Sequence, residues 1–89
     1  MKLPEATTAD ALARLRRVEG QVAGIARMIE SGRECRDVVT QISAASKALE
    51  QIGFKLLASG MRYCVTDEAG ATESGYSVEE LERLFLKLA

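Results

Sequence analysis

The sequence predicts an all-α protein, and three observations support this fold class. Of the 89 residues, 47% are hydrophobic but only 4% are aromatic, and there is a single proline. Apolar residues recur at spacings of three and four, which is the period of an amphipathic helix. Turn signals fall at residues 31–32 and 66–76, so they divide one domain, residues 1–89, into three helices.

The first helix is expected over about residues 8–31. Thr7 or Thr8 is placed to cap its start, and Gly32 is placed to end it as a left-handed C-cap. Residues 1–6 are expected to form a frayed arm. The buried stripe of this helix consists of Leu12, Leu15, Val18, Val22, Ile25 and Ile29.

The second helix is expected over about residues 34–64 and is unusually long for a globular protein. Its apolar stripe is broad enough to pack against the first helix and against a second copy of the chain. Gly53 and Gly60 are the positions at which this helix would bend. The stripe consists of Val38, Val39, Ile42, Ala45, Leu49, Ile52, Leu56, Leu57 and Met61.

Cys35 and Cys64 are the only thiols in a chain without histidine, and they mark the two ends of the second helix. They are 29 positions apart, which is eight helical turns plus about 20°, so both lie on nearly one face. A straight helix separates them by roughly 43 Å, whereas a disulfide needs Cα atoms within about 7 Å. An antiparallel second copy brings Cys35 of one chain beside Cys64 of the other, so the thiols predict a dimer.

The C-terminal region is expected to contain an acidic loop at about 66–76 and a third helix at about 77–88. Ser77 and Glu80 have the spacing of a capping box, and Tyr76 and Leu81 that of a hydrophobic staple. This last helix is placed to cover one end of the dimer.

Charge is distributed unevenly along the chain. Residues 1–62 carry ten Lys or Arg against seven Asp or Glu, whereas residues 63–89 carry two against six. The first two helices are therefore suited to face a polyanion. No apolar run is long enough for a membrane span and no secretory signal is visible, so we expect a cytoplasmic protein. Without histidine, a glycine-rich phosphate loop or a convergent set of carboxylates, the chain is not expected to be an enzyme.

Three parts of the sequence form a recognisable set. They are the Arg14-Leu-Arg-Arg-Val-Glu-Gly-Gln-Val-Ala-Gly-Ile25 block, the Glu34-Cys-Arg-Asp-Val-Val-Thr-Gln-Ile-Ser-Ala44 block and Cys64. Together they resemble the copper-sensitive operon repressor family, called CsoR. The resemblance implies a three-helix protomer without a helix-turn-helix. It also implies an antiparallel four-helix-bundle dimer, a dimer-of-dimers tetramer, and repression through operator DNA.

The identity of the effector depends on few positions in this family. Copper sensors supply Cys, His and Cys, with the histidine four residues before the second cysteine, and here that position is Gly60. Two cysteines without the histidine are typical of the CstR-type persulfide sensors. The resemblance therefore implies that Cys35 attacks a persulfide or polysulfide donor and that Cys64 of the neighbouring chain captures the product as a di- or polysulfide bridge. The alternative is Cu(I) held by the same two thiolates, and no other cofactor is expected.

Family positions that contact operator DNA match Arg14, Arg17 and Gln21, which share one helical line. We expect Arg16 to contribute. Where copper members carry a second DNA-contacting arginine this chain has Gln51, and Lys47 and Lys55 are expected to substitute for it. The same comparison makes Glu80 and Tyr63 candidates for linking the sensing site to the last helix. Without the family resemblance, an alternative interpretation of the arginines is a solvated helix face. The corresponding alternative for the cysteines is that they are small buried hydrophobic residues. A third hypothesis is a helical redox or protein-interaction module that binds no DNA.

Overall fold

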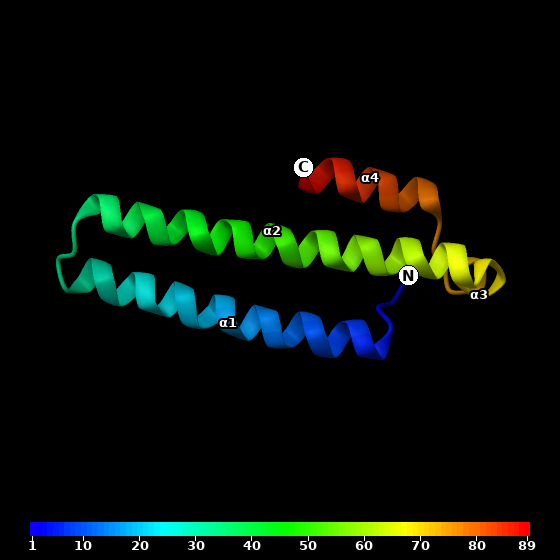
Figure 1. Cartoon of the computed structure of the whole chain (residues 1–89), viewed down its shortest axis with the longest axis horizontal. Helices are drawn as coiled ribbons and strands as arrows, with labels where there is room; N and C mark the ends of the chain where they lie inside the picture. Colours follow the sequence, from blue (N-terminus) through cyan, green and yellow to red (C-terminus); the bar gives the residue numbers. More distant parts are fainter.

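The computed structural model describes residues 1–89, and all of its regular structure is helical (Figure 1). Helices α1 and α2 form a long antiparallel hairpin, and the molecule measures 55 × 24 × 14 Å. The all-α class is confirmed, but the protomer has four helices rather than the predicted three. Their bounds are α1 Glu5–Glu30, α2 Cys35–Thr66, α3 Glu68–Glu73 and α4 Val78–Leu88.

The turn between α1 and α2 has the hydrogen bonds of a Schellman motif. Gly32 has a φ of 76°, its N–H donates to the Ile29 carbonyl at 3.2 Å, and the Arg33 N–H donates to the Met28 carbonyl at 3.0 Å. Only glycine adopts a positive φ at little cost. The expected left-handed C-cap at Gly32 is therefore confirmed.

The start of α1 differs from the prediction. Pro4 is the N-cap, with an extended ψ of 150°, because proline cannot donate a hydrogen bond and its fixed φ suits the residue just before a helix. Thr8 lies inside the helix, where its hydroxyl donates to the Pro4 carbonyl. The Thr7 hydroxyl is 2.7 Å from that of Ser59, so this threonine joins α1 to α2 instead of capping a helix.

Helix α2 is continuous over 32 residues, and its two internal glycines serve α4. A Cβ placed on Gly60 would lie 3.0 Å from Leu81 Cδ2 and 3.1 Å from Tyr76 Cε1. At Gly53, a Cβ would collide with the side chain of Leu88. Because the two glycines are seven residues apart, they share one helix face. They form a shallow track along which α4 approaches α2, and the helix does not break at either.

The prediction of a loop at 66–76 was wrong, because Glu68–Glu73 within it forms the short helix α3. The Asp67 carboxylate accepts a hydrogen bond from the Gly70 N–H at 3.0 Å and caps its start. Gly75, with a φ of 85°, ends it with a second Schellman motif in which the Tyr76 N–H donates to the Ala71 carbonyl. Caps at both ends satisfy backbone groups that a loop would leave to water.

The start of α4 largely follows the sequence prediction. Ser77 is the N-cap, and its hydroxyl accepts from the Glu80 N–H at 3.1 Å. The Glu80 carboxylate is paired with Arg83 at 2.5 Å, so only half of the capping box forms. Tyr76 and Leu81 belong to one buried cluster with Ala71, which is the packing expected of a hydrophobic staple.

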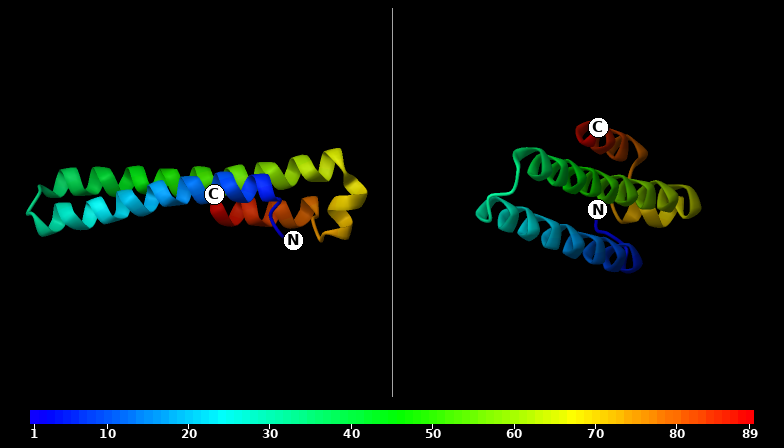
Figure 2. Two further views of the ribbon diagram at one scale, coloured as in Figure 1. Left: turned by 90° about the horizontal axis from the view of Figure 1, so that it is seen from below. Right: turned by 60° about the vertical axis from the view of Figure 1, so that its left-hand side comes forward.

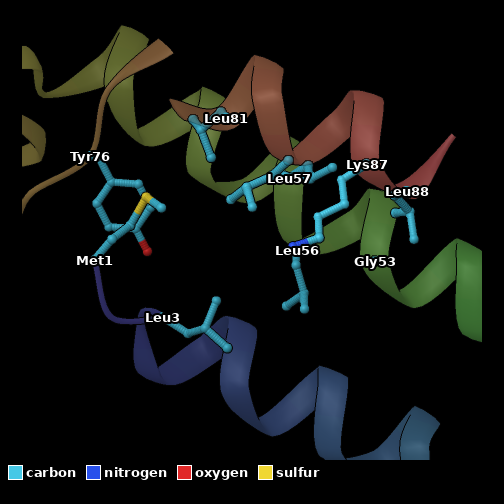
Figure 3. Close-up of a pocket in the computed structure, with 10 residues that line it drawn as sticks. Met1, Leu3, Gly53, Leu56, Leu57, Tyr76, Leu81, Lys87 and Leu88 are labelled. Carbon is cyan, nitrogen blue, oxygen red and sulfur yellow. The ribbon is translucent and has the colours of Figure 1, made fainter. Parts of the chain in front are cut away.

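Figure 1 shows α2 lying between α1 and α4, and the right-hand view in Figure 2 shows the same order. Helix α4 packs on α2 and makes no contact with α1. The N-terminal segment is not a frayed arm, because the Tyr76 hydroxyl donates to the Lys2 carbonyl. Met1 and Leu3 line an apolar cavity of about 380 Å³ against α2 and α4 (Figure 3).

The protomer has little core of its own, since 8 of its 89 residues are buried. A series of large apolar residues on the α1–α2 hairpin stays exposed. Between 38% and 60% of the surface of each residue is accessible to solvent. We call this surface the open face. It consists of Leu12, Leu15, Val22, Ile29, Val39, Ile42 and Leu49.

Candidate functional site

Cys35 is the first residue of α2 and is exposed as a free thiol. The unsatisfied N–H groups and dipole of a helix N-terminus favour an anion, which includes a thiolate. Arg33 and Asp37 lie on either side in sequence and pair with each other at 3.4 Å. The local structure therefore presents Cys35 to solvent at the hairpin end of the molecule.

Cys64 lies near the other end of α2 in a different environment. It is partly buried against the cluster of Ala71, Tyr76 and Leu81. Tyr63, its neighbour in sequence, stacks edge-to-face on Tyr76 with ring centroids 5.2 Å apart. Helices α3 and α4 therefore cover Cys64 with apolar and aromatic side chains.

Tyr76 contacts each of the segments that surround Cys64. Its burial raises the pKa of the phenol above the usual value of 10.0, and the neighbouring Tyr63 and Cys64 raise the pKa further. The neutral phenol is thus the form that the folded protein favours. In that form it donates a hydrogen bond to the Lys2 carbonyl, which fastens the N-terminal segment over the same cluster.

The protomer does not bring its two cysteines together. Because α2 is continuous, its rise of 1.5 Å per residue separates Cys35 and Cys64 by about 43 Å. Both thiols are free, and no group of three or more His, Cys, Asp or Glu in the protomer is placed to hold a metal ion. Any site that uses both cysteines must take one from each of two chains, and that pairing remains a prediction.

Gly60 occupies the position at which the resemblance expects a histidine in copper sensors. The glycine is buried, and Tyr76 and Leu81 occupy the space beside it at the distances given above. The structure therefore shows why this position has no side chain: the C-terminal region packs directly on the helix backbone there.

The predicted DNA-contacting residues fall on two different surfaces. Arg14, whose guanidinium pairs with Asp10 at 2.9 Å, lines a groove of about 430 Å³ between α1 and α2. Gln21 lines a second groove between the same helices, nearer the hairpin turn. Arg16, in contrast, lines the open face. Arg17 and Lys47 are exposed.

Four further basic residues line these grooves, and the sequence suggested only one of them, Lys55, for DNA contact. Lys55 and Arg62 line the groove of Arg14, and Arg27 and Arg33 line that of Gln21. Lys55 and Arg62 are seven residues apart and so share one face of α2, which is a signal that the sequence contained. We call the two grooves together the basic groove.

Tyr63 and Glu80, the residues expected to link the sensing site to the last helix, have different surroundings. Tyr63 contacts Tyr76, and its hydroxyl lies 3.3 Å from that of Ser74. Glu80 faces Arg83 on its own helix. Of these two residues, Tyr63 alone connects the end of α2 with the segment that follows it. Both linking roles remain predictions.

Residues 7–87 match the protein family described as "Metal-sensitive transcriptional repressor". Because the match covers nearly the whole chain, the protein belongs to this family of metal-sensitive transcriptional repressors. It thus belongs to a class of regulators and not of enzymes, as the sequence predicts. None of its helices is long and apolar enough to cross a membrane.

Similar proteins of known role are copper sensors. The chain is 58% identical over 53 residues to the copper-sensing transcriptional repressor RicR of Mycobacterium tuberculosis, a match that covers 60% of this chain and 55% of RicR. It is 38% identical over 74 residues to CsoR of Bacillus subtilis, covering 83% and 73% of the two chains. For CsoR of Mycobacterium bovis the identity is 37% over 71 residues, covering 80% and 60%. These relatives support the CsoR-family resemblance but not the persulfide-sensing subgroup.

Proposed function

We propose that this protein is a DNA-binding transcriptional repressor that releases its operator when Cu(I) binds Cys35 of one chain and Cys64 of a second. The observation that carries the proposal is the placement of the only two thiols at opposite ends of one continuous helix. Membership of the repressor family supports the regulatory role. The copper-sensing relatives support Cu(I) as the effector.

The open face supports the presence of a second chain, as the positions of the two cysteines do. A hairpin that leaves seven large apolar side chains exposed lacks half of a helical bundle core. A second hairpin packed antiparallel covers this surface and places each Cys35 beside the partner's Cys64 by two-fold symmetry. The proposed assembly is therefore a four-helix-bundle homodimer, and two such dimers form the homotetramer that the family resemblance implies.

The donor set suits Cu(I) in part. Thiolates are soft ligands that select this ion over harder divalent metals, and the apolar cover over Cys64 limits water at the site. The Cys35 and Cys64 thiolates of different chains would hold Cu(I), and the bound ion would link the two chains. Gly60, however, supplies no imidazole.

The basic groove lies close enough to Cys64 for effector binding to alter DNA binding. Arg62, which lines that groove, is two residues before Cys64 on the same turn of α2. A bond that draws Cys64 toward the partner therefore acts on the turn that also carries a DNA-facing cation. Differential affinity of the effector for the two arrangements is what couples the sites.

Fluorescence anisotropy of labelled operator DNA tests this function. The apoprotein is expected to bind DNA with an affinity that falls as salt rises, since phosphate contacts release counterions. Arg14→Ala and Arg17→Ala are expected to weaken binding at all sequences. Cu(I) added at one equivalent per chain is expected to release the DNA from the wild type but not from Cys35→Ser. Failure of the wild-type protein to bind any operator DNA at low salt would favour the module that binds no DNA.

Persulfide sensing is a second candidate, favoured by the glycine at position 60 and the exposed thiol of Cys35. The Cys35 thiolate would attack the terminal sulfur of a persulfide RS–SH and displace the thiol RSH, leaving a Cys35 persulfide. The partner's Cys64 thiolate then attacks the Cys35 sulfur and displaces hydrosulfide, which forms the disulfide. Addition of one more sulfur before this step gives a trisulfide.

Intact-protein mass spectrometry distinguishes the two effectors. A covalent dimer after persulfide treatment, together with loss of operator binding, supports the sulfur route. A covalent dimer that still binds DNA excludes that route, and a Cu(I) complex that releases DNA then supports the copper route.

A further inference from the structure

Met61 is a soft donor that neither the core nor the basic groove uses. It lies in α2 with 37% of its surface exposed and belongs to neither buried cluster. It precedes Cys64 by three residues, and residues at this spacing are neighbours on a helix, with Cβ atoms about 5–6 Å apart. We propose that the Met61 thioether is the third ligand of the Cu(I) site, beside Cys64 of the same chain and Cys35 of the second copy.

The chemistry of the thioether fits the vacancy left by histidine. Cu(I) is selected by thiolate and thioether sulfur, and a methionine has no proton to lose on binding. Two thiols release two protons when they bind the ion, so the site with Met61 carries one net negative charge. The long, unbranched methionine side chain adapts to the geometry of a ligand more readily than most side chains.

The other candidates are less well placed for this role. Position 60 has no side chain, and the space around it is taken by Tyr76 and Leu81. Met1 lines the apolar cavity of Figure 3, which Cys64 does not line. Met28 also lies at the hairpin end, where Cys35 is, but it lines the groove with Gln21 and Gln41 and shares no helical turn with a cysteine. Among the three methionines of the chain, Met61 alone shares a helical turn with a cysteine.

This inference rests on the proposed copper function, and the first experiment separates the two. Cu(I) affinity is measured by competition with a chromophoric chelator for the wild-type protein, Met61→Leu and Met28→Leu. Leucine keeps the apolar volume and the helix propensity while it removes the sulfur. Met61→Leu is expected to bind Cu(I) at least about tenfold more weakly, and Met28→Leu is expected to match the wild type.

Each result decides one proposal. Equal affinity in wild type and Met61→Leu overturns the role of Met61 and leaves copper sensing intact. Wild-type protein that binds Cu(I) no more tightly than Cys35→Ser overturns copper sensing itself. Size-exclusion chromatography of the apoproteins checks that Met61→Leu keeps the wild-type oligomeric state, so that a weaker site is not attributed to a lost partner.

A second measurement leaves the side chain in place. In protein labelled with selenomethionine and loaded with Cu(I), X-ray absorption at the selenium edge is expected to show a copper neighbour for one selenium in three. Met28→Leu should keep that signal and Met61→Leu should lose it. A loaded wild-type protein whose selenium spectrum shows no copper neighbour overturns the proposal.

Discussion

The two halves of α2 use the same side of the helix in opposite ways. Ile42, Leu49, Gly53 and Gly60 lie within about 40° of one line along the helix. In the C-terminal half the line carries glycines, and α4 of the same chain lies on them. In the N-terminal half it carries Ile42 and Leu49, large apolar side chains that stay about half exposed in the protomer. Side-chain size thus separates the surface reserved for the chain's own last helix from the surface left for a second copy.

The largest expected effect comes from the uncovered half. Leu49→Glu places a charge in the centre of the open face, where burial in a dimer would desolvate it at a cost of several kcal/mol. We expect the variant to be monomeric in sedimentation equilibrium at concentrations where the wild type is associated. Glu50→Gln, at the neighbouring exposed position, is the control and should leave the mass unchanged. A dimeric Leu49→Glu protein would contradict the assignment of the open face.

A smaller effect is expected in the covered half. Gly60→Val inserts a branched side chain where a single Cβ already meets Tyr76 and Leu81 at 3.0–3.1 Å, so we expect a loss of roughly 1–3 kcal/mol in the free energy of unfolding. Gly20→Val is the matched control, because a Cβ there meets nothing within 4 Å. Urea denaturation measures both. Alkylation of Cys64 should also become faster only in Gly60→Val, as its cover loosens.

Removing a cap tests how firmly α4 is held without changing its packing. Ser77→Ala removes the hydroxyl that accepts from the Glu80 N–H, and we expect it to cost about 1 kcal/mol. Ser77→Asp should retain most of the stability, because aspartate is an equally good N-cap. Hydrogen exchange of the α4 amides checks both variants, and equal exchange in Ser77→Ala and wild type would show that packing alone holds the helix.

The smallest expected effect is a dependence on alkaline pH. The raised pKa of Tyr76 means that the folded protein keeps its phenol proton at pH values where the unfolded chain has lost it. Stability contributed by the neutral phenol is therefore complete below about pH 10 and is lost as pH rises through the folded pKa. Tyr76→Phe should lower stability near neutral pH and flatten the decline above about pH 10 in thermal unfolding. If the loss of stability at alkaline pH is unchanged in Tyr76→Phe, other titrating groups are responsible for it.

Much of the hairpin could be predicted from local sequence. The apolar period of three and four predicts both long helices, and Gly32 predicts the turn because few other residues adopt a positive φ. The Ser77 cap was equally visible. The N-terminal boundary was missed because Pro4 outweighs Thr7 and Thr8, and the latter hydroxyl bonds back to the Pro4 carbonyl. Helix α3 was missed because its glycines and acidic residues resemble a loop unless both caps are recognised together.

For the candidate site, too, the sequence predicted the local features but not those that depend on how the helices pack. The sequence identified the thiols, their spacing and the missing histidine, all of which depend on residue identity and helical rise. It did not show that Arg14 and Arg16 lie on different surfaces, or that Lys55 and Arg62 join the groove of Arg14. Those facts depend on how α1 is rotated against α2, which side chains from both helices decide together.

The sequence by itself determined a long helix with a cysteine at each end and a surface too apolar for one chain, because periodicity and spacing are local properties. Only the tertiary structure decided what the two glycines of α2 are for. They read as points of flexibility in the sequence, but in the fold they admit α4, Tyr76 and Leu81 against the helix backbone. Whether a glycine bends a helix or receives a neighbour depends on what packs there, and that neighbour comes from residues far along the chain.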